Sequence, residues 1–512
     1  MTKNKGESWE NVAAKLPGLP AGSWIPQIVA SRHNAGEAWV VANNYRRNDW
    51  SAYAYHTADY GQTWTRIVDD SDVFGYTLSI LQDPVEPNLV FLGTENGLYV
   101  SFDKAQNWNK WTHGYPSAST MDLAIQEREH DLAIGTFGRA FYVLDDIRPL
   151  RAFAAKGYNN AKNEDLMVFD IADAYQMTYR QPAGMRFPAD GGPFEGENKY
   201  FGQAAVKFYV KNDEAEKPAE AAPQNNRGRR GRNAQPEATE KPADKKLPSR
   251  IKMTVLDASG DTVRTASSNI KKGEINTINW DLNRRNPYPV EFSGGGGFGG
   301  FGGGFGGGNI NREQTAGSAL PGDYTVVLEL GDIKVSKSVK VHLDPRLEVN
   351  LADLRTTQNF VDEVLKMSQT FSKITNRVSD ANNIIEKVEA QMKDADKEET
   401  KALAEALKSI KEKFEPVQKL TTGVRGERGQ ATPRERFDNA NNWLGQARRY
   451  ASNRLTAPGP NEMSLKENAQ QMMNEAMQLV NDFFTNEWPA FKAAYEKTNF
   501  DFFKDFSQPI KN

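Results

Sequence analysis

Residues 57–64 read Thr57-Ala58-Asp59-Tyr60-Gly61-Gln62-Thr63-Trp64. A short hydroxyl side chain followed two residues later by a carboxylate can accept hydrogen bonds from the backbone amides of a tight turn. Gly61 can supply the positive φ that such a turn requires, and Trp64 can then pack beneath the strand it enters. The stretch therefore predicts a hairpin between two antiparallel strands.

The same eight-residue shape occurs twice more. Residues 2–9 read Thr2-Lys3-Asn4-Lys5-Gly6-Glu7-Ser8-Trp9, and residues 101–108 keep a weakened form of it. The pattern predicts a structural role for the defining side chains of all three copies, which are Asn4, Gly6, Trp9, Asp59, Gly61, Thr63, Trp64, Asp103 and Trp108.

A second repeat gives the spacing. The string Leu-Gly-Thr-Glu-Asn-Gly-Leu-Tyr-Val at 92–100 returns about 42 residues later as Ile-Gly-Thr-Phe-Gly-Arg-Ala-Phe-Tyr-Val at 134–143. Repeats of about 40 to 50 residues are typical of the four-stranded blades of a β-propeller. Residues 1–150 are therefore predicted to form a partial propeller of about three blades. Because the first turn motif begins at residue 2, we expect the chain to open inside a blade, either truncated or completed by a partner.

The middle of the chain has a different sequence pattern. Short alternating strands with Gly and Asp turns predict an immunoglobulin- or fibronectin-like β-sandwich over residues 165–346. Two insertions, 213–249 and 293–308, are expected to be disordered because they offer too little apolar burial to offset their ordering entropy. The Arg-Gly cluster at 227–232 can bind RNA, but its acidic flanks favour a solvated loop.

Residues 350–512 are predicted to be helical. Apolar residues alternate three and four apart along one seam, which comprises Phe371, Ile374, Val378, Ala381, Ile385, Val388 and Met392. Three further helices are expected over 398–420, 433–452 and 464–496. The pattern favours a helical bundle, with dimerisation through the seam as a coiled coil as the alternative. The whole chain is thus expected to be mainly β with an α-helical C-terminal region.

Composition excludes several kinds of site. The 64 basic and 67 acidic residues leave a net charge of −3, which shows no footprint for nucleic acid. The absence of cysteine excludes disulfides and thiolate metal sites, and the five histidines lack ligand spacing. We therefore predict no metal and no cofactor. No apolar run reaches the length of a membrane span, and no signal peptide precedes the first turn motif.

The densest polar and aromatic loop is 43–50. Its candidate binding residues, which can stack on sugar rings or hold a carboxylate, are Tyr45, Arg46, Arg47, Asp49 and Trp50. A loop packed against its neighbour would explain the same residues. Glycoside hydrolysis needs two carboxyl groups across the scissile bond. Spacing selects no pair from the candidates Asp49, Asp69, Asp70, Asp72, Glu95, Asp122, Asp145 and Asp146.

These motifs, together with the loop at 43–50, the string at 135–150 and Asp344-Pro345-Arg346, resemble the carboxy-terminal half of large bacterial BNR/Asp-box repeat proteins. Such proteins are similar to sortilin-type propellers and to xyloglucanase-type glycosyl hydrolases. The resemblance covers essentially the whole chain and implies export to the periplasm or cell exterior and glycan ligands, xyloglucan among them. It maps no catalytic Asp onto this chain, and Phe137 stands where the related pattern usually has His.

Two functions follow. The residues favour a non-catalytic binding or scaffold fragment directed at glycans or polypeptides. The family label favours the alternative, a glycosidase acting on a xyloglucan-type polysaccharide, with an active site completed by missing N-terminal blades or by a partner chain.

Overall fold

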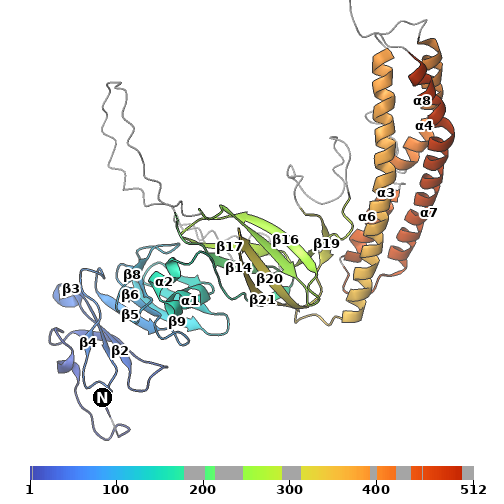
Figure 1. Ribbon diagram of the computed structural model, residues 1–512. Coiled ribbons are helices and arrows are strands. Elements are labelled where there is room, and N and C mark those ends of the chain that lie inside the picture. The colour runs from blue at the N-terminus through green and yellow to red at the C-terminus, as the bar shows by residue number, and fades with distance from the viewer. Residues whose placement is uncertain are drawn as a thin grey trace, which may run out of the picture. The chain divides into compact units, whose positions relative to one another are not determined.

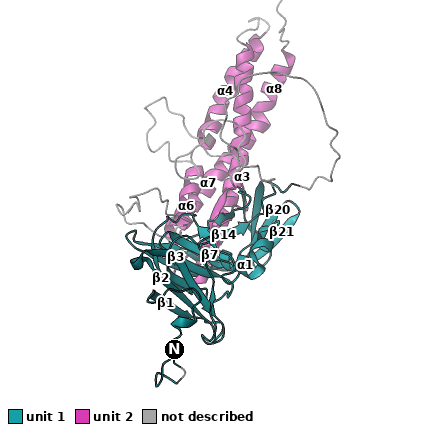
Figure 2. Cartoon of the chain, turned by 90° about the vertical axis from the view of Figure 1, so that its left-hand side faces the viewer, with its two compact units in different colours: residues 1–282, 321–342 teal, residues 283–320, 343–512 magenta. Residues whose placement is uncertain are grey.

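The computed structural model describes residues 1–2, 4–177, 202–213, 246–290, 313–392, 400–422, 440–452 and 454–498. The chain is rich in β-sheet and ends in a helical region (Figure 1). It divides into two compact units, unit 1 comprising Met1–Leu282 with Pro321–His342, and unit 2 comprising Asn283–Leu320 with Leu343–Asn512 (Figure 2). The insertion predicted at 293–308 lies outside the described residues, as does all but the ends of the one predicted at 213–249.

Unit 1 begins with three antiparallel sheets whose strands each pair with the next along the chain. The first sheet contains β1 (Trp24–Ala30), β2 (Ala38–Asn44), β3 (Asp49–Thr57) and β4 (Thr65–Arg66). The second contains β5 (Thr77–Gln82), β6 (Val90–Thr94), β7 (Gly97–Ser101) and β8 (Asn109–Trp111). The third contains β9 (Thr120–Gln126), β10 (Asp131–Thr136) and β11 (Phe141–Leu144). No closed ring of such sheets forms among the described residues.

The three sheets pack face to face. Alternate residues of a strand point to opposite faces, so Phe91 and Leu92 of β6 enter different cores. Leu92 packs with Trp39 of the first sheet, whereas Phe91 packs with Leu123 of the third. The central sheet is therefore covered on both faces, which explains why every residue of β6 and β7 is buried. Leu16, directly after the short helix η1 (Ala13–Lys15), packs on the other face of the first sheet.

The rest of unit 1 contains two helices and two further sheets. The helices are α1 (Arg148–Lys156) and α2 (Tyr158–Lys162). One sheet has the order β12 (Met167–Val168), β14 (Ala204–Tyr209), β17 (Ile275–Trp280). The other has the order β13 (Ala174–Gln176), β21 (Ile333–Leu343), β20 (Gly322–Leu330), β15 (Arg250–Leu256), β16 (Thr262–Asn269). The alternation predicted from the sequence is visible in β15, where Ile251, Met253 and Val255 are buried and their neighbours are not.

Unit 2 is mainly helical. Its helices are α3 (Leu351–Met392), α4 (Lys401–Thr422), α6 (Ala440–Ser452), α7 (Pro460–Asp482) and α8 (Trp488–Lys497), and a short sheet joins β18 (Asn283–Arg285) to β19 (Thr315–Ser318). The apolar seam of α3 packs within the chain, with Phe371 against α6 and α7 and Val378 against α4. The helix predicted over 464–496 is present as an unbroken helical run from α7 to α8, but it contains a π-helical turn, η3 (Phe483–Glu487), that was not predicted. None of the helices in the described part of the chain is long and apolar enough to cross a bilayer.

Candidate functional site

The strand register brings several loops of unit 1 to one end of the sheets. In the first sheet Trp24 pairs with Asn43, and Asn44 pairs with Asp49. The start of β1 therefore lies beside the β2–β3 hairpin. The second and third sheets repeat this arrangement, with Thr77 opposite Thr94 and Thr120 opposite Thr136.

Hydrogen bonds between sheets show that these ends lie next to one another. Asn43 Nδ2 donates to the Thr77 carbonyl at 3.2 Å, and Thr77 Oγ1 donates to the Ala42 carbonyl at 2.9 Å. Ser79 Oγ donates to the Thr120 carbonyl at 3.3 Å, which links the second sheet to the third. We call this set of loops the hairpin end, and it comprises residues 24, 44–50, 74–77, 94–97, 119–120 and 136–141.

Four aromatic side chains gather at the hairpin end. Tyr45 stacks on Tyr76 of the second sheet, with ring centroids 4.4 Å apart and planes 17° from parallel. Trp50 lies 5.7 Å from Tyr76 and 6.3 Å from Tyr45, centroid to centroid. Trp50 is 51% exposed and Trp24 is 60% exposed. We call Trp24, Tyr45, Trp50 and Tyr76 the aromatic cluster.

Arg46 joins this cluster to Trp24. Its guanidinium carbon lies 4.7 Å from the ring centroid of Tyr45 and 5.5 Å from that of Trp24. These are cation–π distances. Among the described residues no carboxylate pairs with Arg46, so its hydrogen-bond donors face solvent.

The other two polar residues predicted in this loop hold it in place. Arg47 Nη1 donates to the Ala21 carbonyl at 2.6 Å, which fixes the segment leading to Trp24. Asp49 accepts hydrogen bonds from Tyr53 Oη at 2.9 Å and from the Ser51 amide at 3.2 Å. Partial burial raises the pKa of Asp49, but these hydrogen bonds outweigh it and the pKa is lowered overall. The five predicted residues thus separate into three that belong to the stacked surface and two that support it.

The turn motifs lie at the opposite end of the sheets, because 57–64 joins β3 to β4 and 101–108 joins β7 to β8. Asp59 accepts from the amides of Gln62 and Thr63, each at 2.9 Å, and Thr63 Oγ1 donates to it at 2.6 Å. Asn4 and Asp103 accept the equivalent amide bonds from Ser8 and Asn107.

The tryptophans of the three copies differ in burial. Trp108 is 9% exposed and donates through Nε1 to the Ile67 carbonyl at 2.8 Å. Trp64 Nε1 donates to the Gly61 carbonyl at 3.2 Å, and Gly61 has a φ of +73° as predicted for a left-handed position. Trp9, beside Gly6, is 73% exposed.

The pKa of Asp59 provides a test of this turn geometry. Hydrogen bonds from the hydroxyl and then the amide of Thr63 lower it from 3.8 to about 2. A lowered pKa means that the carboxylate contributes stability that is fully present above pH 3.8 and is lost as the pH falls through about 2. We expect an NMR titration of the Asp59 carboxyl carbon to show a midpoint near 2, and Thr63→Val to raise it. A midpoint near 3.8 in the unaltered protein would contradict the hydrogen-bond geometry.

Several of the candidate catalytic carboxyl groups are committed to hydrogen bonds or ion pairs. Asp69 accepts from Ser71, and Asp146 pairs with Arg148 at 2.6 Å; both contacts lower the pKa of the carboxyl group against the effect of burial. Asp70 accepts from the Ala52 amide at 3.1 Å. A general acid in glycoside hydrolysis needs a raised pKa. Lowered pKa values are found at carboxyl groups in many places in the described part of the chain, namely Glu37, Asp49, Asp59, Asp69, Asp103, Asp146, Asp213, Glu329, Asp344, Glu415 and Glu462.

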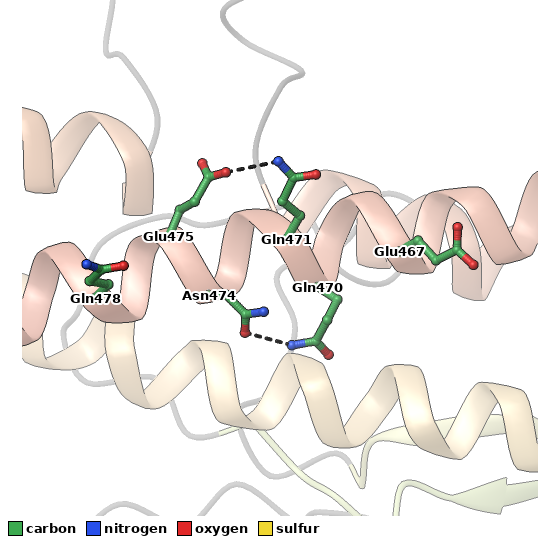
Figure 3. A pocket seen from close by; sticks show the side chains of 6 residues that line it. All are labelled: Glu467, Gln470, Gln471, Asn474, Glu475 and Gln478. Carbon is green, nitrogen blue, oxygen red and sulfur yellow. Dashed lines mark hydrogen bonds between the residues drawn. The ribbon is translucent and has the colours of Figure 1, made fainter.

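Two hollows lie away from the hairpin end. In unit 2 a surface hollow of ≈ 420 Å³ is lined by side chains of α7 alone, and two pairs of these bond to each other, Gln470 to Asn474 at 3.0 Å and Gln471 to Glu475 at 3.1 Å (Figure 3). Such a set belongs to one solvated helix face and does not converge on a ligand. In unit 1 a cleft of ≈ 340 Å³ lies between the second sheet and α2, where Phe102 stacks on Tyr158 with ring centroids 4.8 Å apart.

Comparisons with known proteins give only distant likenesses. No protein-family model and no curated protein matches the chain. Among solved structures, a GH74 enzyme from Niastella koreensis is 15% identical, with a TM-score of 0.22, over 36% of this chain and 28% of its own. A GH74 xyloglucanase from Xanthomonas campestris is 13% identical, with a TM-score of 0.20, over 36% of this chain and 27% of its own. An ancestral GH74 enzyme is 15% identical, with a TM-score of 0.20, over 23% of this chain and 14% of its own. This chain therefore spans less than a third of the length of these structures.

Trp24 and Tyr76 are members of the aromatic cluster that the sequence did not single out. Both occupy the same place in their sheets, at or one residue before the start of the first strand. A comparison of the repeats by strand, in addition to turn motif, would have paired them.

Proposed function

We propose that unit 1 carries three blades of an Asp-box β-propeller beside an immunoglobulin-like sandwich, and that its hairpin end is a non-catalytic binding surface for glycans. The observation that supports this function most directly is the aromatic cluster with Arg46 across it. It combines a stacked pair, Tyr45 and Tyr76, with the exposed rings of Trp24 and Trp50. The propeller assignment is supported by the repeated antiparallel sheets and by their turn motifs.

The chemistry of the cluster suits a sugar chain. Trp and Tyr present a flat apolar face and a polar edge, which match the C–H face and the hydroxyl rim of a sugar ring. The rings are already held by stacking and by the hydrogen bonds that Arg47 and Asp49 make within the loop, so little conformational entropy is lost on binding. A preformed aromatic surface with hydrogen-bond donors at its margin therefore supports recognition of a glycan. This proposal is consistent with a location outside the cytoplasm, as the resemblance implies.

Binding without hydrolysis is the favoured form of this proposal. Asp49, the carboxylate nearest the cluster in sequence, is committed to hydrogen bonds that lower its pKa. Such a group is ionised near neutral pH and has no proton to donate. The alternative, a glycosidase completed by further blades or by a partner chain, receives no support from the carboxyl groups described above.

The test is a binding measurement on the full chain. We expect isothermal titration calorimetry against a panel of neutral and acidic oligosaccharides to find at least one ligand. Trp50→Ala and Trp24→Ala should each weaken its binding by up to roughly tenfold, because each removes one stacking ring worth about 0.5–1.5 kcal/mol. Both side chains are more than half exposed, so the fold should tolerate their loss.

Trp9→Ala is the control, since Trp9 is also an exposed tryptophan, at 73%, and belongs to a turn motif outside the hairpin end. It should leave binding unchanged. If no saccharide binds, or if Trp9→Ala weakens binding as much as Trp50→Ala, the hairpin end is not a glycan-binding surface.

A further inference from the structure

We propose that the glycan bound at the hairpin end is acidic and that Arg46 binds a ring carboxylate of it, as in a uronic acid. This inference rests on the proposed function, and it goes further by naming the ligand class and the residue that selects it. The observation that supports it is the position of the Arg46 guanidinium, which lies over the rings of Tyr45 and Trp24 and has no carboxylate partner among the described residues.

Stacking prepares Arg46 to bind an anion. A guanidinium that lies over two aromatic rings loses much of its freedom to rotate before any ligand arrives. The N–H groups at the edge of the Arg46 guanidinium bond to no other residue that the structure describes, so they are available to a ligand. The edge is the part that binds a carboxylate through two parallel hydrogen bonds. A sugar ring on Trp50 or Trp24 that carries a carboxylate can therefore be held by its face and by its charge together.

The charged side chains next to Arg46 in the loop form their hydrogen bonds elsewhere. Arg47 is directed to the Ala21 carbonyl, and Asp49 is bonded to Tyr53 and Ser51. Glu95 is the acidic residue whose charge is felt at the cluster. Burial is the largest cause that raises the pKa of Tyr76, and the negative charge of Glu95 is the second largest. The positive charge of Arg46 lowers the pKa of Tyr76. Glu95 should therefore weaken the binding of an acidic ligand without being a contact for it.

The experiment compares three probes on the full chain by calorimetry: tetragalacturonate, its fully methyl-esterified form, and poly-glutamate. The esterified form keeps the ring and removes the charge. We expect tetragalacturonate to bind at least tenfold more tightly than the ester at low salt, and the difference to shrink as salt is added. Equal binding of acid and ester would overturn the acidic class and leave the glycan function standing. Binding of poly-glutamate alone would overturn both and assign the surface to acidic peptides. Binding of none of the three would overturn the acidic class, and the saccharide panel described above would then decide the glycan function.

Variants then assign the selectivity to Arg46. Arg46→Gln should weaken tetragalacturonate binding roughly 10- to 100-fold, as expected for a charged hydrogen-bonded pair, and should bring the affinities for the acid and the ester close to each other. Arg46→Lys should recover only part of the loss, because an ammonium lacks the bidentate fork. Glu95→Gln should tighten binding of the acid alone.

Arg128→Gln is the matched control, since Arg128 is an exposed arginine of unit 1 that pairs with Glu129 outside the hairpin end. It removes the same charge and should not change the ratio of acid to ester. If Arg128→Gln lowers that ratio as much as Arg46→Gln, overall charge and not Arg46 selects the ligand. A circular dichroism spectrum and melting curve for each variant will show whether the fold is intact.

Discussion

Asp83→Ala is expected to lower the free energy of unfolding by about 3–5 kcal/mol, because it leaves a buried arginine without its counter-charge. Asp83 is fully buried, and Arg151 on α1 is 8% exposed. Arg151 Nε donates to Asp83 Oδ2 at 2.9 Å, and its Nη1 lies 2.8 Å from Nδ1 of His130. Asp83 also accepts from the Val85 amide at 2.8 Å, so its removal leaves a partly buried donor unpaired as well.

The measurement is urea unfolding of the full chain followed by tryptophan fluorescence. Only Trp443 and Trp488 of the ten tryptophans lie in unit 2, so the signal reports mainly on unit 1. Glu127→Ala is the control, because it breaks the exposed pair between Glu127 and Arg32 and should cost no more than about 1 kcal/mol.

A double variant separates the charge from the packing. Asp83→Leu combined with Arg151→Met removes both charges and should recover part of the stability lost in Asp83→Ala, since a buried pair is often replaceable by apolar groups. A loss below about 1 kcal/mol for Asp83→Ala would show that the contact between the second sheet and α1 does not depend on this ion pair.

Gly93→Ala is expected to destabilise unit 1 by about 1–3 kcal/mol through overpacking. A Cβ at residue 93 would lie 2.2 Å from Ser79 Oγ, 2.6 Å from the Thr120 carbonyl oxygen and 2.8 Å from Thr120 Cγ2. The backbone oxygen cannot rotate away as a flexible side chain can. The second and third sheets meet at this point, so one methyl group would push them apart.

Gly135 offers a matched control, because it holds the same place in the repeated string. A Cβ at residue 135 would find its nearest neighbour, the Asp122 carbonyl oxygen, at 3.6 Å, which is an ordinary contact. Gly135→Ala should therefore change the free energy of unfolding by no more than about 0.5 kcal/mol. Equal effects of the two substitutions on the urea midpoint would mean that the sheets are not in close contact at Gly93.

Features that depend on neighbouring residues could be predicted from the sequence. The hydrogen bonds of the turn at 57–64 link residues no more than four positions apart, and strand alternation in β15 follows from a period of two. Features that depend on distant residues could not. Tyr45 and Tyr76 meet only because β5 packs beside β2, and Asp83 and Arg151 are 68 positions apart.

The candidate site was likewise predictable only where it depends on neighbouring residues. Its loop could be recognised by composition, but the separation of Arg46 from Arg47 required knowing which arginine is satisfied by a backbone carbonyl. The π-helical turn between α7 and α8 was also missed, because the apolar spacing on either side of it still suits one continuous helix. Sequence period constrains which residues share a face and does not reveal an added backbone residue within a turn.

The turn motifs and the hairpin end occupy opposite ends of the same sheets. One consequence concerns how the protein can be attached to a support. A tether placed in the turn at 57–64, for example at exposed Thr63, would leave Trp24 and Trp50 directed away from the support. Immobilised arrays, fluorescent conjugates and fusions joined at that end should thus present the aromatic cluster to soluble polysaccharide without covering it.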